Sequence, residues 1–320
     1  MAAGSRGGEP AASGKNQLMR LVCWIGTERP YEEVLETALL AERLGYDGIY
    51  LADHFMADTT PPAGSRLEAW TTLAALAART ERVRLGVLVS GNTYRHPAIL
   101  AKMAATTDRI SDGRLVLGLG AGWQLSEHVA YGIELPEVPE LLGRLDEACQ
   151  VIRSLLTKDR SDFDGRWYHL EDAPCDPKPV QARLPLLLGV SGEKIAMGIA
   201  AREADIWNYW GTPDQIGHKI SVLEQHCETA GRDPSTIERS AQALIRMSTD
   251  AAELERWRSE PARMPTIVGT PEELSGELAR YDELGVDEFV VSERVLGEST
   301  SERAEVLEQL INEVGVAVHD

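Results

Sequence analysis

The sequence contains no apolar run of the roughly 18 residues that a transmembrane helix needs, so no membrane span is expected. Its first segment, residues 1–17, is rich in Gly, Ala and Ser and lacks the apolar stretch of a secretory signal, so we expect a disordered arm there. Positive charge is also scarce, because 32 Lys and Arg stand against 51 Asp and Glu and the formal net charge is −19. This acidic balance argues against nucleic acid and anionic membranes as partners.

Cysteine is equally sparse. Of the four cysteines, Cys23, Cys149 and Cys227 lie inside apolar patterns, and no two form a C-x-x-C pair. This usage indicates reduced thiols in the cytoplasm rather than a disulfide framework or a zinc site. The histidines show no H-x-H or H-E-x-x-H spacing, and no G-x-S-x-G or P-loop occurs. These absences argue against a barrel metallohydrolase, a serine hydrolase and a P-loop NTPase.

What the chain does contain is a regular alternation of strand-like and helix-like segments from residue 18 to the end. The predicted strands cover residues 18–25, 48–52, 83–90, 114–119, 184–190, 204–209, 237–247 and 286–291. A segment with helical spacing follows each of them, including residues 31–44, which Gly45 is well placed to end, and residues 97–110, which begin with Pro97. Apolar strands separated by helices imply a parallel sheet covered on both sides. Eight such units predict an α/β fold, a (β/α)8 TIM barrel over residues 18–320, with a doubly wound open sheet as the alternative.

One stretch, residues 159–180, interrupts this alternation. It contains the aromatic run Phe163 to Leu170 around the turn pair Asp164-Gly165. An Asp-Gly pair between such residues is typical of a β-hairpin. We therefore predict a short hairpin insertion between the fourth and fifth strands of the barrel.

Polar, Gly-rich or aromatic residues follow the predicted strands. An α/β barrel builds its active site at these C-terminal strand ends, so function explains the set better than packing does. His54 follows the second strand, where a His can donate a hydrogen bond or move a proton near neutral pH. A histidine held in a structural hydrogen-bond network is the equally weighted alternative. Arg95, after the third strand, is either a solvated loop charge or an anion contact.

The segment from Gly189 to Lys194 is the clearest candidate site from physical reasoning. A strand ends there in a Gly-rich turn and a helix is expected to start at once, so free N–H groups point at a place that fits a phosphate. The alternative is an ordinary tight turn with Ser191 as N-cap, and the two interpretations are evenly balanced. The run Gly118 to Gly122 is a weak dinucleotide fingerprint, which we interpret as backbone kept thin so that a flat ring can approach.

Tryptophans near the strand ends are candidates for an apolar pocket. Trp207 lies within a strand and is an equally good core residue. The predicted substrate pocket consists of Trp24, Trp123 and Trp210.

Several long motifs, in order along the chain, resemble the bacterial luciferase-like oxidoreductases, and specifically the branch that uses the deazaflavin coenzyme F420. The matching stretches are YLADHF (50–55), residues 80–123 from TERVRLG to GLGAGW, SEHVAYG (126–132) and LLLGVSGEKIAMGIAAREADIWN (186–208). The similarity covers about residues 18 to 315. The resemblance implies a (β/α)8 barrel and an F420-dependent oxidoreductase acting on a small-molecule substrate. An FMN-dependent monooxygenase and a non-catalytic ligand-binding barrel stay open as alternatives, as do a monomer and a homodimer.

The resemblance also implies roles for individual residues. The family often has a non-prolyl cis peptide behind the ring system, which here would fall at Leu88-Val89 or Val89-Ser90. Residues 90–92 would contact the ring edge or side chain, His128 and Tyr131 the polar tail, and residues 189–192 the phosphate. His54 would be the catalytic residue at the cofactor face. The predicted cofactor-binding residues are Asp53, His54, Val89, Ser90, Gly91, Asn92, Gly122, His128, Tyr131, Gly189, Val190, Ser191 and Gly192.

Two positions depart from the resemblance. The sugar-phosphate and alcohol dehydrogenases of this family carry a Trp four residues after the His and a Glu after the Gly-rich turn. Asp58 and Trp123 stand at these places here. The departures favour reduction of an unsaturated substrate over alcohol or sugar-phosphate oxidation, with the deazaflavin supplying the hydride chemistry.

Overall fold

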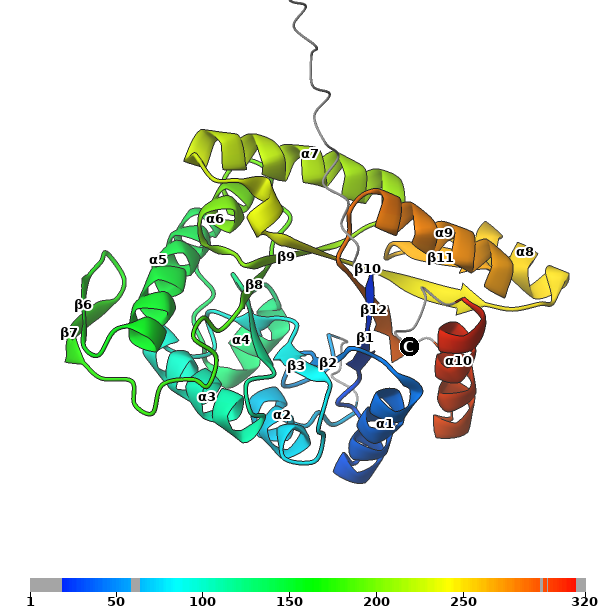
Figure 1. Cartoon of the computed structure of the whole chain (residues 1–320), viewed down its shortest axis with the longest axis horizontal. Helices are drawn as coiled ribbons and strands as arrows, with labels where there is room; N and C mark the ends of the chain where they lie inside the picture. Colours follow the sequence, from blue (N-terminus) through cyan, green and yellow to red (C-terminus); the bar gives the residue numbers. More distant parts are fainter. Residues whose placement is uncertain (1–18, 59–63, 294–295, 298, 315–320) are drawn as a thin grey trace, which may run out of the picture.

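The computed structural model describes residues 19–58, 64–293, 296–297 and 299–314, and the predicted N-terminal arm lies outside these. Eight parallel strands form a ring at the centre of the molecule (Figure 1). In chain order these are β1 (Arg20–Ile25), β2 (Gly48–Leu51), β3 (Arg84–Val87), β5 (Leu115–Gly120), β8 (Leu186–Gly189), β9 (Ile206–Trp210), β10 (Glu238–Met247) and β12 (Glu288–Ser292). Strand β12 pairs with both β10 and β1, so the ring closes. The predicted TIM barrel is confirmed.

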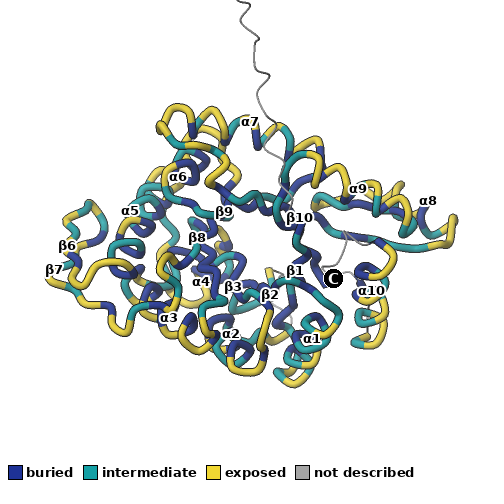
Figure 2. The backbone as a smooth tube through the Cα atoms, in the orientation of Figure 1, coloured by how far each residue is buried: buried dark blue, intermediate teal, exposed yellow. Residues whose placement is uncertain are grey.

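Helices surround this ring and bury their apolar faces against it. They are α1 (Tyr31–Leu44), α2 (Ala69–Ala77), α3 (Pro97–Ile110), α5 (Val138–Thr157), α6 (Ala196–Glu203), α7 (Pro213–Ala230), α9 (Pro271–Glu283) and α10 (Thr300–Glu313). Figure 2 shows the buried residues on the strands and on the inward helix faces, with exposed residues outside. Gly45 ends α1 in the left-handed conformation, with φ of 99°, and Pro97 begins α3, both as predicted.

The barrel interior has an ionic end and an apolar middle. Glu288 is fully buried at the N-terminal end, where Ser240 Oγ donates to its Oε1 at 2.8 Å and Arg84 Nη1 lies 3.8 Å from its Oε2. Above it lies an apolar cluster of Val22, Tyr50, Leu88, Val116, Leu187, Ile206 and Val290. These layers fill the barrel, so ligands have access only from the C-terminal ends of the strands.

The predicted insertion is a hairpin of β6 (Ser161–Asp164) and β7 (His169–Ala173), which projects at the left edge of Figure 1. Five other short elements were not predicted: β4 (Ser90–Gly91), α4 (Leu125–Tyr131), the 3₁₀ helix η1 (Pro234–Thr236), α8 (Ala251–Ser259) and β11 (Thr266–Gly269). The last two form because β10 continues past the barrel and pairs with β11 over Leu244–Met247. The simple pattern of one helix after each strand was therefore incomplete.

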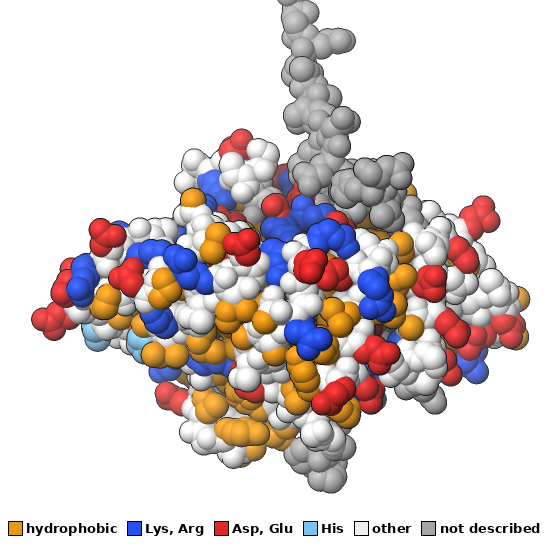
Figure 3. Space-filling model, turned by 60° about the horizontal axis from the view of Figure 1, so that its bottom comes forward, with side chains coloured by type: hydrophobic (Ala, Val, Ile, Leu, Met, Phe, Trp, Pro, Cys, Tyr) orange, Lys and Arg blue, Asp and Glu red, His pale blue; other side chains and the backbone are white. Residues whose placement is uncertain are grey.

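The surface carries charges of both signs. Figure 3 shows acidic and basic side chains interspersed with hydrophobic ones over one face, with Lys and Arg gathered near its upper centre. The net negative charge therefore does not make this face uniformly acidic. Within the described residues, none of the helices has the length and apolar character needed to cross a bilayer.

Candidate active site

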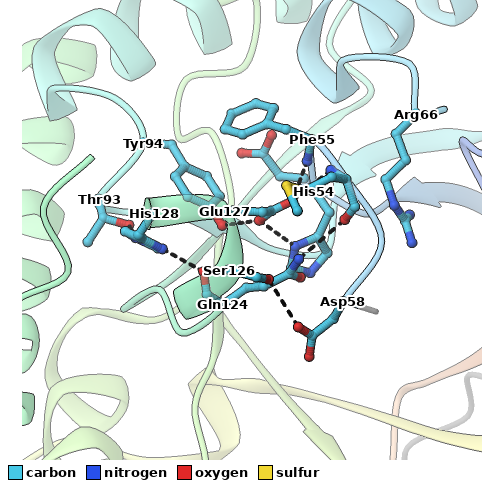
Figure 4. A network of polar contacts seen from close by, with 12 residues as sticks. His54, Phe55, Asp58, Arg66, Thr93, Tyr94, Gln124, Ser126, Glu127 and His128 are labelled. Atoms are coloured by element: carbon cyan, nitrogen blue, oxygen red, sulfur yellow. Dashed lines mark hydrogen bonds and ion pairs between the residues drawn. The ribbon is translucent and has the colours of Figure 1, made fainter. Parts of the chain in front are cut away.

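His54 lies three residues beyond the end of β2, at the C-terminal mouth of the barrel. Its Nδ1 is 3.0 Å from Oε2 of Glu127, which α4 places beside it (Figure 4). The His54 side chain is 23% exposed, whereas that of Glu127 is completely buried. Because a buried carboxylate holds one ring nitrogen, the other nitrogen, Nε2, is left for chemistry.

Glu127 accepts hydrogen bonds on both of its carboxylate oxygens. Oε1 accepts from the backbone N–H groups of Phe55, at 2.5 Å, and Met56, at 2.9 Å, while Oε2 accepts from Tyr94 Oη as well as facing His54. Burial alone raises the pKa of Glu127, but the hydrogen bonds from His54, Tyr94 and Met56 outweigh it and lower the pKa to about 2. Glu127 is therefore a carboxylate at any working pH.

Sequence reasoning missed Glu127, although it lies in the SEHVAYG stretch that carries the family resemblance. The signal was present as a periodicity. Gln124, Glu127 and His128 are buried while Leu125 and Val129 are exposed, so α4 turns its polar face inward. A short helix with its polar residues buried indicates a built polar site rather than a solvated surface.

Aromatic rings surround the His54–Glu127 pair. The rings of Trp123 and His54 meet edge to face with centroids 5.4 Å apart, and Trp123 is 61% exposed. The Phe55 ring packs against the rings of Tyr94 and Tyr131, with centroid distances of 4.8 Å and 5.2 Å. The rings shield the polar contacts of Glu127 from one side, which strengthens them.

Asp53, a predicted cofactor contact, is engaged by the protein itself, and its contact with a cofactor stays a prediction. Its buried carboxylate forms a two-point ion pair with Arg95, whose Nη2 also reaches Glu68 Oε1 at 2.5 Å. Burial raises the pKa of Asp53, and the hydrogen bond and charge of Arg95 partly offset this rise. Arg95 is thus neither solvated nor free to hold a ligand anion, since internal carboxylates already occupy it.

The three tryptophans predicted to line one pocket separate into two groups. Trp24 and Trp210 make an edge-to-face pair with centroids 5.7 Å apart, and Trp123 contacts His54 instead. Trp24 Nε1 is buried without a hydrogen-bond partner within the described residues, as is Oγ of Ser292, which pairs with Trp24 across the strands. Trp207 is fully buried and belongs to the core.

The peptide between Leu88 and Val89 is cis, at one of the two positions expected from the resemblance. The neighbouring glycines make room for this segment of the chain. The interpretation from the sequence was that they make room for a flat ring, and the structure shows a more direct reason for them. A Cβ on Gly118 would lie 1.9 Å from the carbonyl oxygen of Val87, and one on Gly120 would lie 2.7 Å from a methyl of Val89. A Cβ on Gly189 would likewise lie 2.9 Å from the other methyl of Val89.

Residues 90–92 are buried beside this peptide. Ser90 Oγ accepts a hydrogen bond from Trp70 Nε1 at 2.8 Å, and Gly91 lies under the ring of Tyr94. Asn92 donates from Nδ2 to Tyr168 Oη at 3.2 Å. Its Oδ1 is buried and has no partner among the described residues, so it is an acceptor still to be satisfied.

His128 and Tyr131, the predicted contacts for the polar tail, differ in exposure. His128 is buried, with Nδ1 2.8 Å from the Gln124 carbonyl oxygen and Nε2 2.8 Å from Thr93 Oγ1. The same threonine packs against Gly122, whose φ of 98° favours glycine. Tyr131 is 58% exposed. The role of both residues toward a cofactor stays a prediction.

The turn after β8 differs from the expectation in one respect. Helix α6 begins at Ala196, and Ile195 is its N-cap without a side-chain hydrogen bond, so Ser191 is not the cap. Ser191 and Gly192 are exposed, while Val190 is buried. Lys219 Nζ donates to the Ser191 carbonyl oxygen at 2.9 Å and brings a positive charge to this turn. Over the described part of the chain, no cluster of His, Cys, Asp or Glu has the arrangement of a metal site.

Comparison with known proteins places this barrel. Residues 16–264 match the family model described as "Luciferase-like monooxygenase". The chain belongs to the luciferase-like family. Over 222 residues it is 34% identical to a protein of Microbacterium testaceum named F420-dependent glucose-6-phosphate dehydrogenase, a match that covers 68% of this chain. The matched stretch spans 65% of that relative, which is less than two thirds of its length.

Solved structures share the fold of this luciferase-like chain. An F420-dependent secondary alcohol dehydrogenase in complex with an F420-acetone adduct aligns with a TM-score of 0.80 and 21% identity, covering 93% of this chain and 100% of that one. The coenzyme F420 dependent tetrahydromethanopterin reductase from Methanopyrus kandleri aligns with a TM-score of 0.78 and 17% identity, covering 93% and 98%. At these identities the likeness establishes the barrel architecture alone.

Proposed function

We propose that this luciferase-like protein is a coenzyme F420-dependent oxidoreductase that transfers hydride between the deazaflavin and an organic substrate, with His54 moving the proton. The observation that carries the proposal is the His54–Glu127 pair at the mouth of the barrel, because it leaves a histidine nitrogen free at the place where this fold puts its chemistry. The names of the relative and of the two structural neighbours support F420 as the cofactor.

The residues present fit such a cofactor. The buried, unpartnered Oδ1 of Asn92 is an acceptor suited to an N–H or hydroxyl of a ring system or its side chain. In this assignment Val89, Ser90, Gly91, Asn92 and Gly122 hold the ring and its side chain. The turn of Gly189, Val190, Ser191 and Gly192, exposed at its last two residues, holds the phosphate through backbone N–H groups. Tyr131, with His128 behind it, lies toward the tail.

The chain itself supplies orientation and a proton path. When bound, F420 supplies the hydride chemistry at its C5. His54 Nε2 gives or takes the proton that accompanies the hydride, since Nδ1 is engaged by Glu127. Trp123 covers one edge of His54 and limits access of water, and the Trp24–Trp210 pair gives the mouth an apolar wall.

The direction we favour is reduction of an unsaturated substrate, because Trp123 and Asp58 stand where the sugar-oxidising relatives are expected to carry Glu and Trp. Asp58 accepts from Ser126 Oγ at 3.0 Å. Oxidation of glucose 6-phosphate is the second candidate, favoured by the name of the relative. A groove of about 710 Å³ beside the ends of β9 and β10 is lined by arginines, the side chains that would pair with the phosphate group of such a substrate. Three of them are already paired with carboxylates, namely Arg246, Arg258 and Arg280.

Cofactor titration is the first test. The purified protein is titrated with F420 and, separately, with FMN, and binding is followed by fluorescence and absorbance. We expect saturable binding of F420 and none of FMN. Tight FMN binding without F420 binding would instead identify a flavin monooxygenase, and binding of neither would leave a barrel without this chemistry. Oxidation of reduced F420 by cyclohex-2-en-1-one, compared with reduction of F420 by glucose 6-phosphate, then distinguishes the two candidate reactions.

Substitution of His54 tests the proton role. His54→Ala is expected to lower turnover by about 10²- to 10⁴-fold, the usual contribution of general acid–base catalysis, while F420 affinity and the melting temperature stay close to wild type. The matched control is His169→Ala, which removes an exposed histidine of the β6–β7 hairpin that pairs with Asp164. Turnover of the control should be unchanged. An active His54→Ala enzyme would assign the proton to another residue.

A further inference from the structure

Glu127 engages Nδ1 of His54 in the proposed function, and it is the most heavily hydrogen-bonded carboxylate near that ring. Its two oxygens do different work. Oε1 holds the backbone N–H groups of Phe55 and Met56, and Oε2 faces His54 Nδ1 and Tyr94 Oη. The side chain is completely buried on α4, whereas His54 belongs to the loop after β2. One residue therefore fixes both the backbone that follows His54 and the ring itself.

The proton count at Oε2 determines the state of the ring. A carboxylate can only accept hydrogen bonds, so the atom of His54 that faces it has to carry hydrogen. The neutral form of His54 is then the tautomer protonated at Nδ1, with the lone pair on Nε2. Tyr94 cannot take over this task, because its hydroxyl proton already points to the same oxygen.

We propose that Glu127 is a positioning residue that locks His54 in the Nδ1–H tautomer and so makes Nε2 the atom that exchanges the proton. The proposal rests on the proposed function for its kinetic consequence, but the tautomer itself is a property of the protein without cofactor. Both oxygens of Glu127 are used, so the same carboxylate orients the ring and holds the Phe55-Met56 turn in place.

The other charged and titratable groups close to the ring do not supply this hydrogen bond. Asp53 precedes His54 in the chain, but its two oxygens are paired with Arg95. Tyr94 Oη donates to Glu127, and the neighbouring Trp123 has no side-chain acceptor to offer His54. Glu127 is therefore the single acceptor that faces Nδ1 within the described residues.

Replacement by glutamine reverses the polarity of one oxygen and leaves the other in place. In Glu127→Gln the amide oxygen is expected to keep the Phe55 and Met56 N–H groups, because those two donors need an acceptor. The amide NH₂ then takes the place of Oε2 and donates toward His54 Nδ1. The ring has to respond by moving its proton to Nε2. The expected result is a switch of tautomer without loss of the fold.

Nitrogen-15 NMR of histidine-labelled protein without cofactor measures the tautomer directly, and the His54 signals are assigned from their absence in His54→Ala. We expect Nδ1–H in the wild type and Nε2–H in Glu127→Gln. Tyr94→Phe is the matched control, because it removes a neighbour of the same oxygen but leaves Glu127 on His54, so it should retain Nδ1–H. A wild-type ring protonated at Nε2, or a Glu127→Gln ring unchanged from wild type, overturns the proposal. The wild-type spectrum decides the matter even if the variant fails to fold.

Kinetics supply the second readout. In the reductive direction, Glu127→Gln is expected to lower kcat while KM and F420 affinity stay close to wild type, because the carboxylate that orients His54 Nε2 for proton transfer is lost. A purely structural role would instead lower the melting temperature and weaken substrate and F420 binding together with kcat. If the protein turns out not to bind F420, the proposed function fails while the NMR result still stands or falls alone.

Discussion

Ser240 and Ser292 are both 1% exposed inside the barrel, but their hydroxyls are in opposite situations. Ser240 Oγ donates to Glu288 at 2.8 Å and accepts from Asn208 Nδ2 at 2.9 Å. Ser292 Oγ has no partner within the described residues. A buried hydroxyl costs free energy unless it is hydrogen-bonded. The Ser240 hydroxyl therefore stabilises the fold, whereas the Ser292 hydroxyl destabilises it.

This contrast gives a prediction at the scale of one atom. Ser240→Ala should lower the free energy of unfolding by about 1–3 kcal/mol, because it leaves the buried Glu288 and Asn208 short of a partner. Ser292→Ala should leave the free energy of unfolding unchanged or raise it slightly. Urea denaturation of the two variants and the wild type measures both. Equal losses in the two variants would mean that Ser292 has a hydrogen-bond partner after all.

Among the helices, glycine tests how local conformation and tertiary packing combine. Gly276 lies exposed inside α9, where an added Cβ would meet no atom within 4 Å. Gly143 lies inside α5, where a Cβ would come within 2.1 Å of the Trp167 ring. Both glycines weaken the helix that contains them, but only Gly143 makes room for a neighbour.

We therefore expect opposite effects from one substitution. Gly276→Ala should raise the free energy of unfolding by about 0.5–1 kcal/mol, because alanine loses less conformational freedom in a helix. Gly143→Ala should lower the free energy of unfolding, because the ring of Trp167 has to move. Thermal melts followed by circular dichroism give both signs. A loss of stability in Gly276→Ala would show that propensity does not govern this position.

The elements also show what the sequence could and could not predict. The eight barrel strands and the helix bounds 31–44 and 97–110 followed from apolar periodicity and from stop signals such as Gly45. Helix α4 did not, because it is only seven residues long and its periodicity buries polar residues, which apolar patterning does not detect. The purpose of Gly118 and Gly120 was also hidden, since the atoms that they accommodate, the Val87 carbonyl oxygen and the Val89 side chain, come from the segment at the end of β3. Contacts between distant segments decide such positions.

For the whole molecule, acid stability depends on carboxylates whose pKa values the fold has shifted in both directions. Hydrogen bonds outweigh burial at Glu127 and lower its pKa to about 2. At Glu288 burial dominates and raises the pKa, although Arg84 and Arg20 oppose the rise. Burial likewise raises the pKa of Glu293, against the charge of Arg29. As the pH falls, protonation of Glu288 and Glu293 favours the folded chain, whereas Glu127 favours the unfolded one.

Glu127 should therefore dominate the strongly acidic part of the stability profile. In the unfolded chain the Glu127 carboxyl has its ordinary pKa of about 4.5, and in the folded chain its pKa is about 2. The unfolded chain therefore takes up the proton first, and the free energy of unfolding falls as the pH drops between these two values. The contribution at neutral pH is on the order of 3 kcal/mol. In Glu127→Gln this pH-dependent part is absent, so the stability of wild type relative to the variant should shrink steadily from pH 5 to pH 2. Urea denaturation across this range measures the difference. A difference that stays constant with pH would mean that the Glu127 carboxyl titrates alike in the folded and unfolded chains.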